Sequence, residues 1–506
     1  MKRLALLFIL LASPAFSEVK PARIFSNHMV LQRESPVAIF GTAAALEKVT
    51  VSFADQKVTT RADSGGNWLV FLKPMESNAK GQRLTINNIE IEDVLVGDIW
   101  LSSGQSNMRW TVSQSTNGAS AIDEGEHQNI RLLDFIGTVY PSRKIFPIEQ
   151  LKELTAENYF RTEGWQPATP ATIGSFSAVA YYFGRRLSKE VGVPIGLIHT
   201  AVGGTMMENY ISRESLQATD GLSNVLENWL ESEKVPAWCR GRAAYNLQAW
   251  LLEYPHAPLP HHPFEPGFLF DAGIRHLAPF ALKGVLWYQG ESNAPIEISE
   301  NPYTGGYDLE YSQLKFKTLI RDWRRHWQKE DLPFYFVQLP GLNRPWASFR
   351  EMQLETHLEI PSTGMVVTYD WGSPKNVHPA DKQPVGERLA LWALAKNNGK
   401  DVVYSGPVYK SCREKGNKLE LSFTLCRGAS LSSLDNRELL GFEIAGEDNR
   451  YFPATAEIVG EKVLLSSPEV IFPKRARYAW MNDPKGKANF GTRSGLPASP
   501  FRTHKW

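Results

Sequence analysis

The feature that most constrains this fold is a series of five short apolar runs, separated by segments with helical periodicity. Such alternation is typical of a parallel sheet in an α/β domain. The expected strands are residues 94–102, 194–200, 284–288, 334–339 and 365–369. Apolar side chains recur at three- and four-residue steps in the expected helices, which are residues 176–187, 314–327 and 385–395.

Polar, often glycine-rich segments follow four of these strands. They are Gly-Gln-Ser-Asn-Met at 104–108, Gly-Gly-Thr at 203–205, Gln-Gly-Glu-Ser-Asn at 289–293, and Asn-Val-His-Pro at 376–379. In open parallel sheets, ligands bind beyond the carboxyl ends of the strands. We therefore expect these distant segments to meet at one edge of the sheet and to form a site there.

The regions on either side of the α/β pattern show short apolar runs with turn signals between them, as in all-β domains. The length of 506 residues also favours more than one domain. The sequence predicts a β-domain at 18–95, an α/β domain at 96–398 and a sandwich-like β-domain at 399–506. Its proline-rich end, residues 496–503, is expected to pack back on the body without regular structure.

The first 17 residues have the pattern of a secretory signal peptide. Lys2 and Arg3 precede an apolar run at 4–12, and Ala-Phe-Ser at 15–17 gives a small-x-small cleavage site. The run is shorter than a membrane-spanning helix, which disfavours the alternative of an uncleaved anchor. We expect export to the periplasm or the cell exterior, with a mature chain that begins near Glu18 and has no membrane segment.

Charge and cysteine content exclude several functional classes. The chain has 55 Lys and Arg against 54 Asp and Glu, so it lacks the basic field of a nucleic-acid-binding protein. Three cysteines are too few for a disulfide scaffold and lack zinc-site spacing. Cys412 and Cys426 flank an expected hairpin centred near Gly416, but that centre does not place them opposite each other, so a disulfide between them stays open.

Two residues at the predicted edge could form a nucleophile–base pair. Ser106 follows a strand directly, where a tight turn can expose a hydroxyl to a base and a substrate. His378, after the last strand, is the natural base near neutral pH. Taken alone, Ser106 could simply cap a helix and His378 could be a surface residue.

The remaining loops offer groups that could support such a pair. The Gly-Gly-Thr turn presents backbone N–H groups, including that of Gly204, where an oxyanion could be held. Gln289 could donate a side-chain N–H to the same oxyanion, and Glu291 could orient His378. Taken alone, these are ordinary polar loop residues.

In this order, the segments resemble the sialate O-acetylesterase family of the SGNH hydrolases. The most specific is Trp-Tyr-Gln-Gly-Glu-Ser-Asn at 287–293, and the resemblance extends over nearly the whole mature chain, from Met-Val-Leu-Gln at 29–32 to Gly-Leu-Pro-Ala at 495–498. It implies a three-layer α/β/α SGNH-hydrolase domain flanked by the two β-domains.

The resemblance also implies roles for individual residues. Ser106 would be the nucleophile and His378 the general base, with the backbone N–H groups of Ser106 and Gly204, and Gln289 as a third donor, holding the oxyanion. Many SGNH enzymes carry an aspartate three residues before the histidine, where this chain has Lys375. Glu291 is the favoured third member of the triad and Asp370 the rival.

The function implied is hydrolysis of O-acetyl esters on sialic acids through a serine acyl-enzyme, without a cofactor or metal. The expected partner is an O-acetylated sugar, and the sequence leaves the oligomeric state open. Tyr210 stands where many relatives have tryptophan, which leaves the fine substrate preference open. Two alternatives stay open: an acetyl esterase for another glycan, such as xylan, and a catalytically inactive carbohydrate-binding protein.

Overall fold

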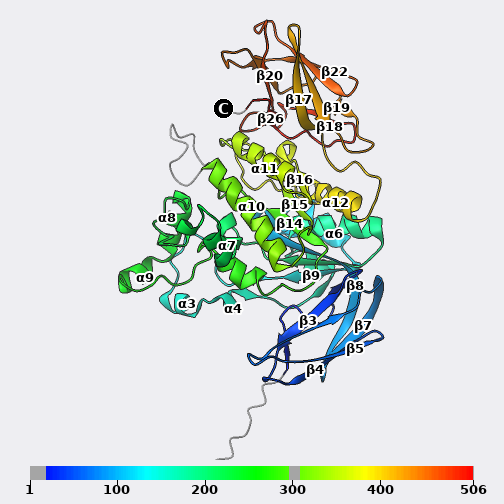
Figure 1. Cartoon of the computed structure of the whole chain (residues 1–506), viewed down its shortest axis with the longest axis vertical. Coiled ribbons are helices and arrows are strands. Elements are labelled where there is room, and N and C mark those ends of the chain that lie inside the picture. Colours follow the sequence, from blue (N-terminus) through cyan, green and yellow to red (C-terminus); the bar gives the residue numbers. More distant parts are fainter. Residues whose placement is uncertain (1–18, 296–307, 505–506) are drawn as a thin grey trace, which may run out of the picture.

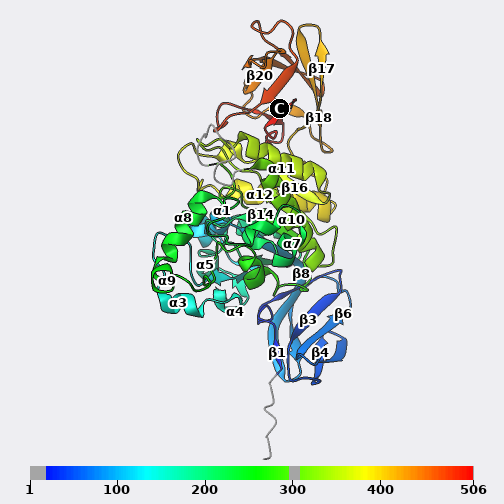
Figure 2. The same cartoon turned by 60° about the vertical axis from the view of Figure 1, so that its left-hand side comes forward.

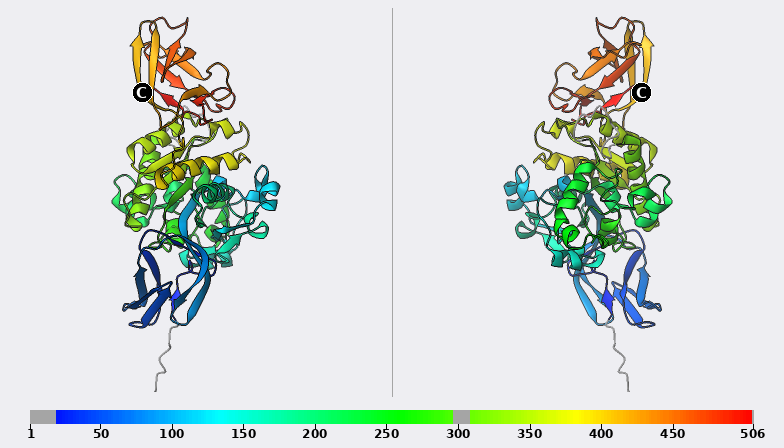
Figure 3. Two further views of the ribbon diagram at one scale, coloured as in Figure 1. Left: turned by 90° about the vertical axis from the view of Figure 1, so that its right-hand side faces the viewer. Right: turned by 90° about the vertical axis from the view of Figure 1, so that its left-hand side faces the viewer.

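The computed structural model describes residues 19–295 and 308–504, so the predicted signal peptide at 1–17 lies outside the described residues. Three regions follow one another along the long axis (Figures 1 and 2). The N-terminal strands lie at one end, helices and a central sheet in the middle, and the C-terminal strands at the other end; the side views in Figure 3 show the same order. No helix in the described part of the chain is long and apolar enough to span a bilayer.

The central sheet contains all five strands that the sequence predicts. Their order is β9-β13-β8-β14-β15-β16, with every neighbouring pair parallel, and β12 joins the β9 edge in antiparallel orientation. The strands are β8 (Ile89–Gly104), β9 (His127–Asp134), β12 (Gln166–Ala168), β13 (Ile195–His199), β14 (Gly284–Tyr288), β15 (Phe334–Val337) and β16 (Thr363–Val366).

Helices pack against both faces of this sheet, because successive strand residues point to opposite sides. On one face, Trp100 and Leu286 share a core with α6 (Ala178–Val191) and α12 (Gln383–Asn397). On the other, Leu101 and Val285 share a core with α10 (Leu309–His326), beside which lies α11 (Ala347–Glu359). The three helices predicted from periodicity correspond to α6, α10 and α12.

Strand β8 links the N-terminal strands to the central sheet. Its first half pairs with β7 (Asn78–Ile86) and β2 (Val30–Gln32), and its second half pairs with β13 and β14. The predicted boundary between residues 95 and 96 falls inside this 16-residue strand. A break in composition therefore does not coincide with a break in the backbone. The other N-terminal strands are β1 (Lys20–Pro21), β3 (Val37–Thr42), β4 (Lys48–Phe53), β5 (Gln56–Arg61) and β6 (Asn67–Leu72).

The C-terminal region consists mainly of two four-stranded antiparallel sheets, ordered β17-β18-β23-β22 and β21-β20-β24-β26. Phe423 of the first sheet contacts Phe501 of the second, so the two share a core. The strands are β17 (Val408–Lys415), β18 (Lys418–Thr424), β20 (Phe442–Ala445), β21 (Phe452–Pro453), β22 (Thr455–Val459), β23 (Lys462–Ser466), β24 (Arg475–Tyr478) and β26 (Phe501–Arg502).

Two expectations for this region are tested directly. The hairpin turn lies at Gly416, as predicted, but Cys412 faces Leu421 across it and Cys426 lies beyond the strand end, so both thiols are free. The proline-rich end packs back on the body, since Ser499 accepts a hydrogen bond from Gln338 at 2.9 Å. The expectation that this end lacks regular structure is wrong for β26, which pairs with β24.

Candidate active site

The structure brings Ser106 and His378 together at the carboxyl edge of the central sheet. His378 Nε2 lies 2.8 Å from Ser106 Oγ, within hydrogen-bonding distance, although 272 residues separate them in the sequence. Ser106 follows β8, and His378 follows β16 in the loop before α12. A serine hydroxyl this close to an imidazole can pass its proton to the ring as it attacks an electrophile.

The turn before Ser106 is fixed by Gly104. Its φ of +133° lies in the region that favours glycine, and a Cβ there would come within 2.1 Å of the Tyr288 carbonyl oxygen. The next residue is held to the neighbouring loop, because Gln105 Oε1 accepts hydrogen bonds from the backbone N–H groups of Gly290 and Ser292. The serine turn and the glutamate-bearing loop are therefore one hydrogen-bonded unit.

His378 is held by its loop and by an aromatic neighbour. Its backbone N–H donates to Asn376 Oδ1 at 2.9 Å, and its ring stacks on Trp110 with a centroid separation of 5.4 Å. Burial and the nearby charge of Lys382 lower the pKa of His378 from its ordinary value. The neutral ring, which is the form able to accept a proton, is favoured as a result.

The backbone N–H groups of Ser106 and Gly204 are both available beside the serine hydroxyl. Gly203 follows β13 and lies next to Ser106, and Gly204, at φ +80°, is packed so closely that an added Cβ would be 3.2 Å from the Phe264 ring. Within residues 19–295 and 308–504, no group accepts a hydrogen bond from the N–H of Ser106 or Gly204. The turn therefore leaves two donors beside the hydroxyl, as an oxyanion site requires.

Gln289 lies at the same edge but is engaged elsewhere. Its side-chain amide donates to Thr205 O at 3.1 Å and to Asn293 Oδ1 at 2.8 Å. Both of its amide hydrogens are therefore in use, one joining its loop to the Gly-Gly-Thr turn and the other within the 289–293 loop. The expected role as a third oxyanion donor would require one of these bonds to break.

Tyr210 is fully buried beneath the edge of the sheet. Its hydroxyl donates to Gly104 O at 2.9 Å and accepts from Val202 N at 3.0 Å, so it supports the turns on both sides of the serine. Its hydroxyl is therefore held by backbone groups, and its side chain has no exposed surface.

The two candidate carboxylates differ in their surroundings. Glu291 is 4% exposed and accepts a hydrogen bond from Asn107 Nδ2, and burial raises its pKa. Asp370 forms a two-point ion pair with Arg388 of α12, at 2.8 and 2.5 Å. Among the hydrogen bonds of the described residues, neither carboxylate contacts the His378 ring, so Glu291 can act on it only through intermediate groups.

Sequence reasoning did not single out three of the residues that surround the pair. Asn107 and Lys382 are completely or almost completely buried and hydrogen-bonded to each other, and Trp110 stacks on the histidine. Asn107 follows Ser106 and Lys382 lies four residues after His378, which is the only signal in the sequence that could have pointed to them.

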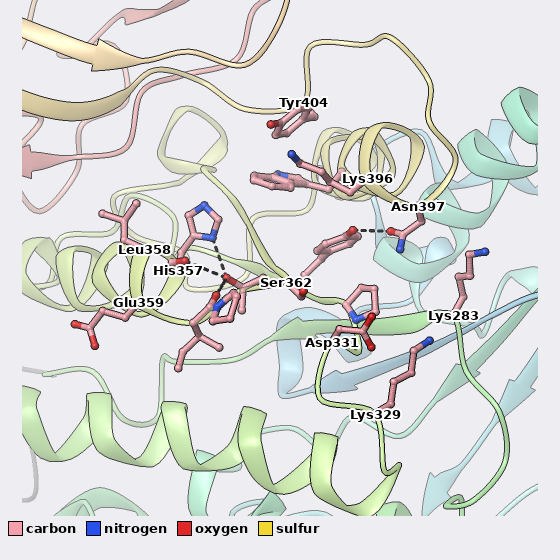
Figure 4. Close-up of a pocket in the computed structure, with 16 residues that line it drawn as sticks. Lys283, Lys329, Asp331, His357, Leu358, Glu359, Ser362, Lys396, Asn397 and Tyr404 are labelled. Atoms are coloured by element: carbon pink, nitrogen blue, oxygen red, sulfur yellow. Dashed lines mark hydrogen bonds between the residues drawn. The ribbon is translucent and has the colours of Figure 1, made fainter. Parts of the chain in front are cut away.

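A cavity of about 850 Å³ lies at the opposite edge of the sheet (Figure 4). It is lined by residues that precede β15 and β16, such as Pro333 and Ser362, and by the end of α12, including Lys396. Its histidine, His357, lies 3.0 Å from the Thr363 hydroxyl, and among the hydrogen bonds of the described residues none joins it to Ser362. The described residues also contain no cluster of His, Cys, Asp and Glu suited to a metal ion.

Comparison with known proteins relates this chain to carbohydrate esterases. Residues 268–394 match the family model for carbohydrate esterase, sialic acid-specific acetylesterase. The sialate O-acetylesterase of Mus musculus is 30% identical, with 95% of this chain and 93% of that protein covered, and the Homo sapiens sialate O-acetylesterase is 29% identical, with 95% and 91% covered.

A solved structure agrees over the same extent. The carbohydrate acetylesterase from Xanthomonas citri is 31% identical, with a TM-score of 0.76 and coverage of 97% of this chain and 100% of that chain. Because both sequence and fold correspond along almost the entire length, the chain belongs to the sialate O-acetylesterase family.

Proposed function

We propose that this protein removes O-acetyl groups from sugars with Ser106 as nucleophile and His378 as general base. The observation that carries the proposal is the 2.8 Å contact between these side chains, beside two backbone N–H groups with no other partner among the described residues. The family assignment supplies the reaction class, and this geometry supplies residues able to perform it.

The proposed reaction has two steps. Ser106 Oγ attacks the acetyl carbonyl carbon while His378 Nε2 takes its proton, and the N–H groups of Ser106 and Gly204 stabilise the oxyanion. The protonated His378 then gives its proton to the departing sugar oxygen, leaving an acetyl-serine. Water, deprotonated by His378, attacks the acetyl-serine, and acetate is released as His378 returns that proton to Ser106 Oγ.

The finer features of the fold and location form part of the same proposal. We assign an SGNH-hydrolase domain of three layers to residues 96–398, flanked by β-domains at 18–95 and 399–506. The helix layers on both faces of the parallel sheet support this assignment. The pattern at residues 1–17 supports export to the periplasm or the cell exterior.

The proposed substrate is an O-acetylated sialic acid, as the names of the relatives indicate. Sialic acids carry a carboxylate, and two guanidinium groups near the site could attract it. Arg344, after β15, is near enough to Glu291 to oppose the rise that burial causes in its pKa, and Arg109 lies three residues after Ser106 over the Tyr140 ring. Across the described part of the chain, neither guanidinium forms an ion pair with a carboxylate. A neutral acetylated glycan such as xylan is the alternative.

The test of the nucleophile is Ser106→Ala, assayed for release of acetate from a chromogenic acetate ester. We expect turnover to fall by at least about 10³-fold, because the acyl-enzyme cannot form. Ser113→Ala, which changes an exposed serine just after α1 (Ser106–Arg109), should keep full activity, and both variants should show the wild-type melting temperature. Full activity in Ser106→Ala would overturn the proposal.

The test of the substrate is Arg344→Gln, assayed with O-acetylated N-acetylneuraminic acid and with an uncharged acetylated xyloside. Losing a charge-assisted hydrogen bond to the carboxylate should lower kcat/KM for the acidic sugar by roughly 10- to 100-fold. The uncharged sugar should be affected little, and Arg344→Lys should retain more of the preference. An equal loss on both sugars would exclude recognition of the carboxylate by Arg344.

A further inference from the structure

A buried lysine lies directly behind the serine–histidine pair. Lys382 is 1% exposed and immediately precedes α12, four residues after His378. Its ammonium donates a hydrogen bond to Asn107 Oδ1 and lies 5.7 Å from the ring centre of Trp110 and 5.5 Å from that of Tyr288. A charged group so completely removed from water is costly to bury, so its retention calls for a specific reason.

Asn107 connects this lysine to three loops of the site. It follows Ser106 in α1 and is fully buried. Its Nδ2 donates to Glu291 Oε1 and, at 2.9 Å, to the carbonyl oxygen of Val377, the residue before His378. A side-chain amide can be rotated so that its oxygen and nitrogen exchange places. Among the described residues, the Lys382 ammonium is the one donor to this oxygen, and because an ammonium only donates, it holds the nitrogen toward the two acceptors.

The same lysine is linked to the histidine ring by a second route. Trp110 lies between them, with one contact to the Lys382 ammonium and a stacked contact to His378. The position of the ring is therefore constrained through the Val377 backbone on one side and through Trp110 on the other. Both constraints depend on Lys382.

We propose that Lys382 is a positioning residue for the esterase reaction. It fixes the orientation of Asn107, which ties the serine turn to the histidine loop and to Glu291, and its positive charge keeps His378 in the neutral form that accepts the serine proton. This inference rests on the proposed function, since it assigns a role within the same serine–histidine chemistry.

The charges around the site agree with this role. Lys382 faces Glu291 from the loop after β14, Asp381 from its own loop, and the π face of Tyr288. Burial lowers the pKa of Lys382 to about 7, against the opposing effect of the two carboxylates, so the ammonium is charged in mildly acidic solution. There it adds to the lowering of the His378 pKa that burial causes and, together with Arg344, opposes the rise that burial causes in the pKa of Glu291.

The direction of the expected pH effect follows from the positive charge of Lys382 near His378. Below neutral pH the rate falls as His378 becomes protonated, and a nearby positive charge opposes that protonation. Removing the charge should therefore raise the pKa of His378. The acidic limb of the kcat/KM profile should move to higher pH, by roughly 0.5–1 unit.

The experiment compares Lys382→Met with the full-length wild-type enzyme on a chromogenic acetate ester between pH 4.5 and 8.5. We expect kcat to fall by roughly 10- to 100-fold with KM changed little, and the acidic limb to move upward. Lys375→Met removes an exposed lysine from the same loop and should leave the profile in place, because solvent and salt screen that charge. An unchanged limb and kcat in Lys382→Met would overturn the inference.

A second variant covers the case in which Lys382→Met does not fold. Asn107→Ala breaks the bridge but leaves the lysine charge, so kcat should fall while the acidic limb stays within about 0.3 unit of the wild type. A wild-type kcat in this variant would also overturn the inference. Failure of the proposed function is recognised separately, by full activity in Ser106→Ala.

Discussion

At the scale of single residues, two carboxylates that look alike in the sequence differ in their burial and in their hydrogen-bond partners. Glu291 has one oxygen on Asn107 and a second buried oxygen, Oε2, without a hydrogen-bond partner in the part of the chain that the structure describes. Asp370 has both oxygens on Arg388. Glu291 therefore has one oxygen without a partner among the described residues, at the edge of the sheet that carries Ser106 and His378. Both oxygens of Asp370 bind Arg388 and so hold α12.

This difference predicts opposite effects of two conservative substitutions. Glu291→Gln should lower kcat by up to about 10²-fold, because the Asn107 bridge to the histidine loop loses its anionic acceptor. Asp370→Asn should lower the melting temperature through the lost ion pair and leave kcat within about threefold. Steady-state kinetics and thermal unfolding of both variants test this, and a larger kcat loss in Asp370→Asn would make Asp370 the acidic partner instead.

At the scale of elements, the central strands were predictable because they are almost continuous runs of buried apolar residues. β13 and β14 were each predicted to within one residue at either end. β9 was missed, since it begins with His-Gln-Asn at 127–129 and has only three apolar residues, Ile130, Leu132 and Leu133, interrupted by Arg131. A strand of this composition carries too little apolar periodicity to be distinguished from a loop.

The candidate site was predictable only in part, for a related reason. Ser106 and His378 could be placed at one edge because each follows a strand of the same parallel sheet. The contact between Asn107 and Lys382 gave no such signal, because it depends on how three loops pack above the strands. A sequence also does not show which hydrogen bonds a side chain makes. The side-chain amide of Gln289 was therefore predicted to be a free donor, although in the structure both of its hydrogens are in use.

At the scale of the whole molecule, Arg350 of α11 joins the central region to the C-terminal strands. It is fully buried, and its guanidinium donates to the carbonyl oxygens of Pro340, Met481 and Asn482. Burial lowers its pKa to about 10, so it remains charged under all physiological conditions. Pro340 follows β15, and residues 481 and 482 follow β24, so one side chain holds two distant regions together.

Arg350→Met should therefore lower the free energy of unfolding by about 2–4 kcal/mol, because buried carbonyl groups lose their donors. Arg413→Met, which alters an exposed arginine of β17 paired with Glu420, should change it by less than about 1 kcal/mol. Urea titration of both variants measures the difference. A loss for Arg350→Met no larger than that of Arg413→Met would show that the C-terminal strands are held by other contacts.

The length of β8 limits how this protein can be divided. Any truncation that removes the N-terminal strands would expose the lateral hydrogen-bonding groups of Val94–Val96, only ten residues before the turn that carries Ser106. A recombinant fragment starting at residue 96 would also begin in mid-strand, with an apolar end open to aggregation. Gene fusions and fragments made for crystallisation should therefore keep residues 19–104 intact, and shuffling of this region between homologues would have to exchange the serine along with it.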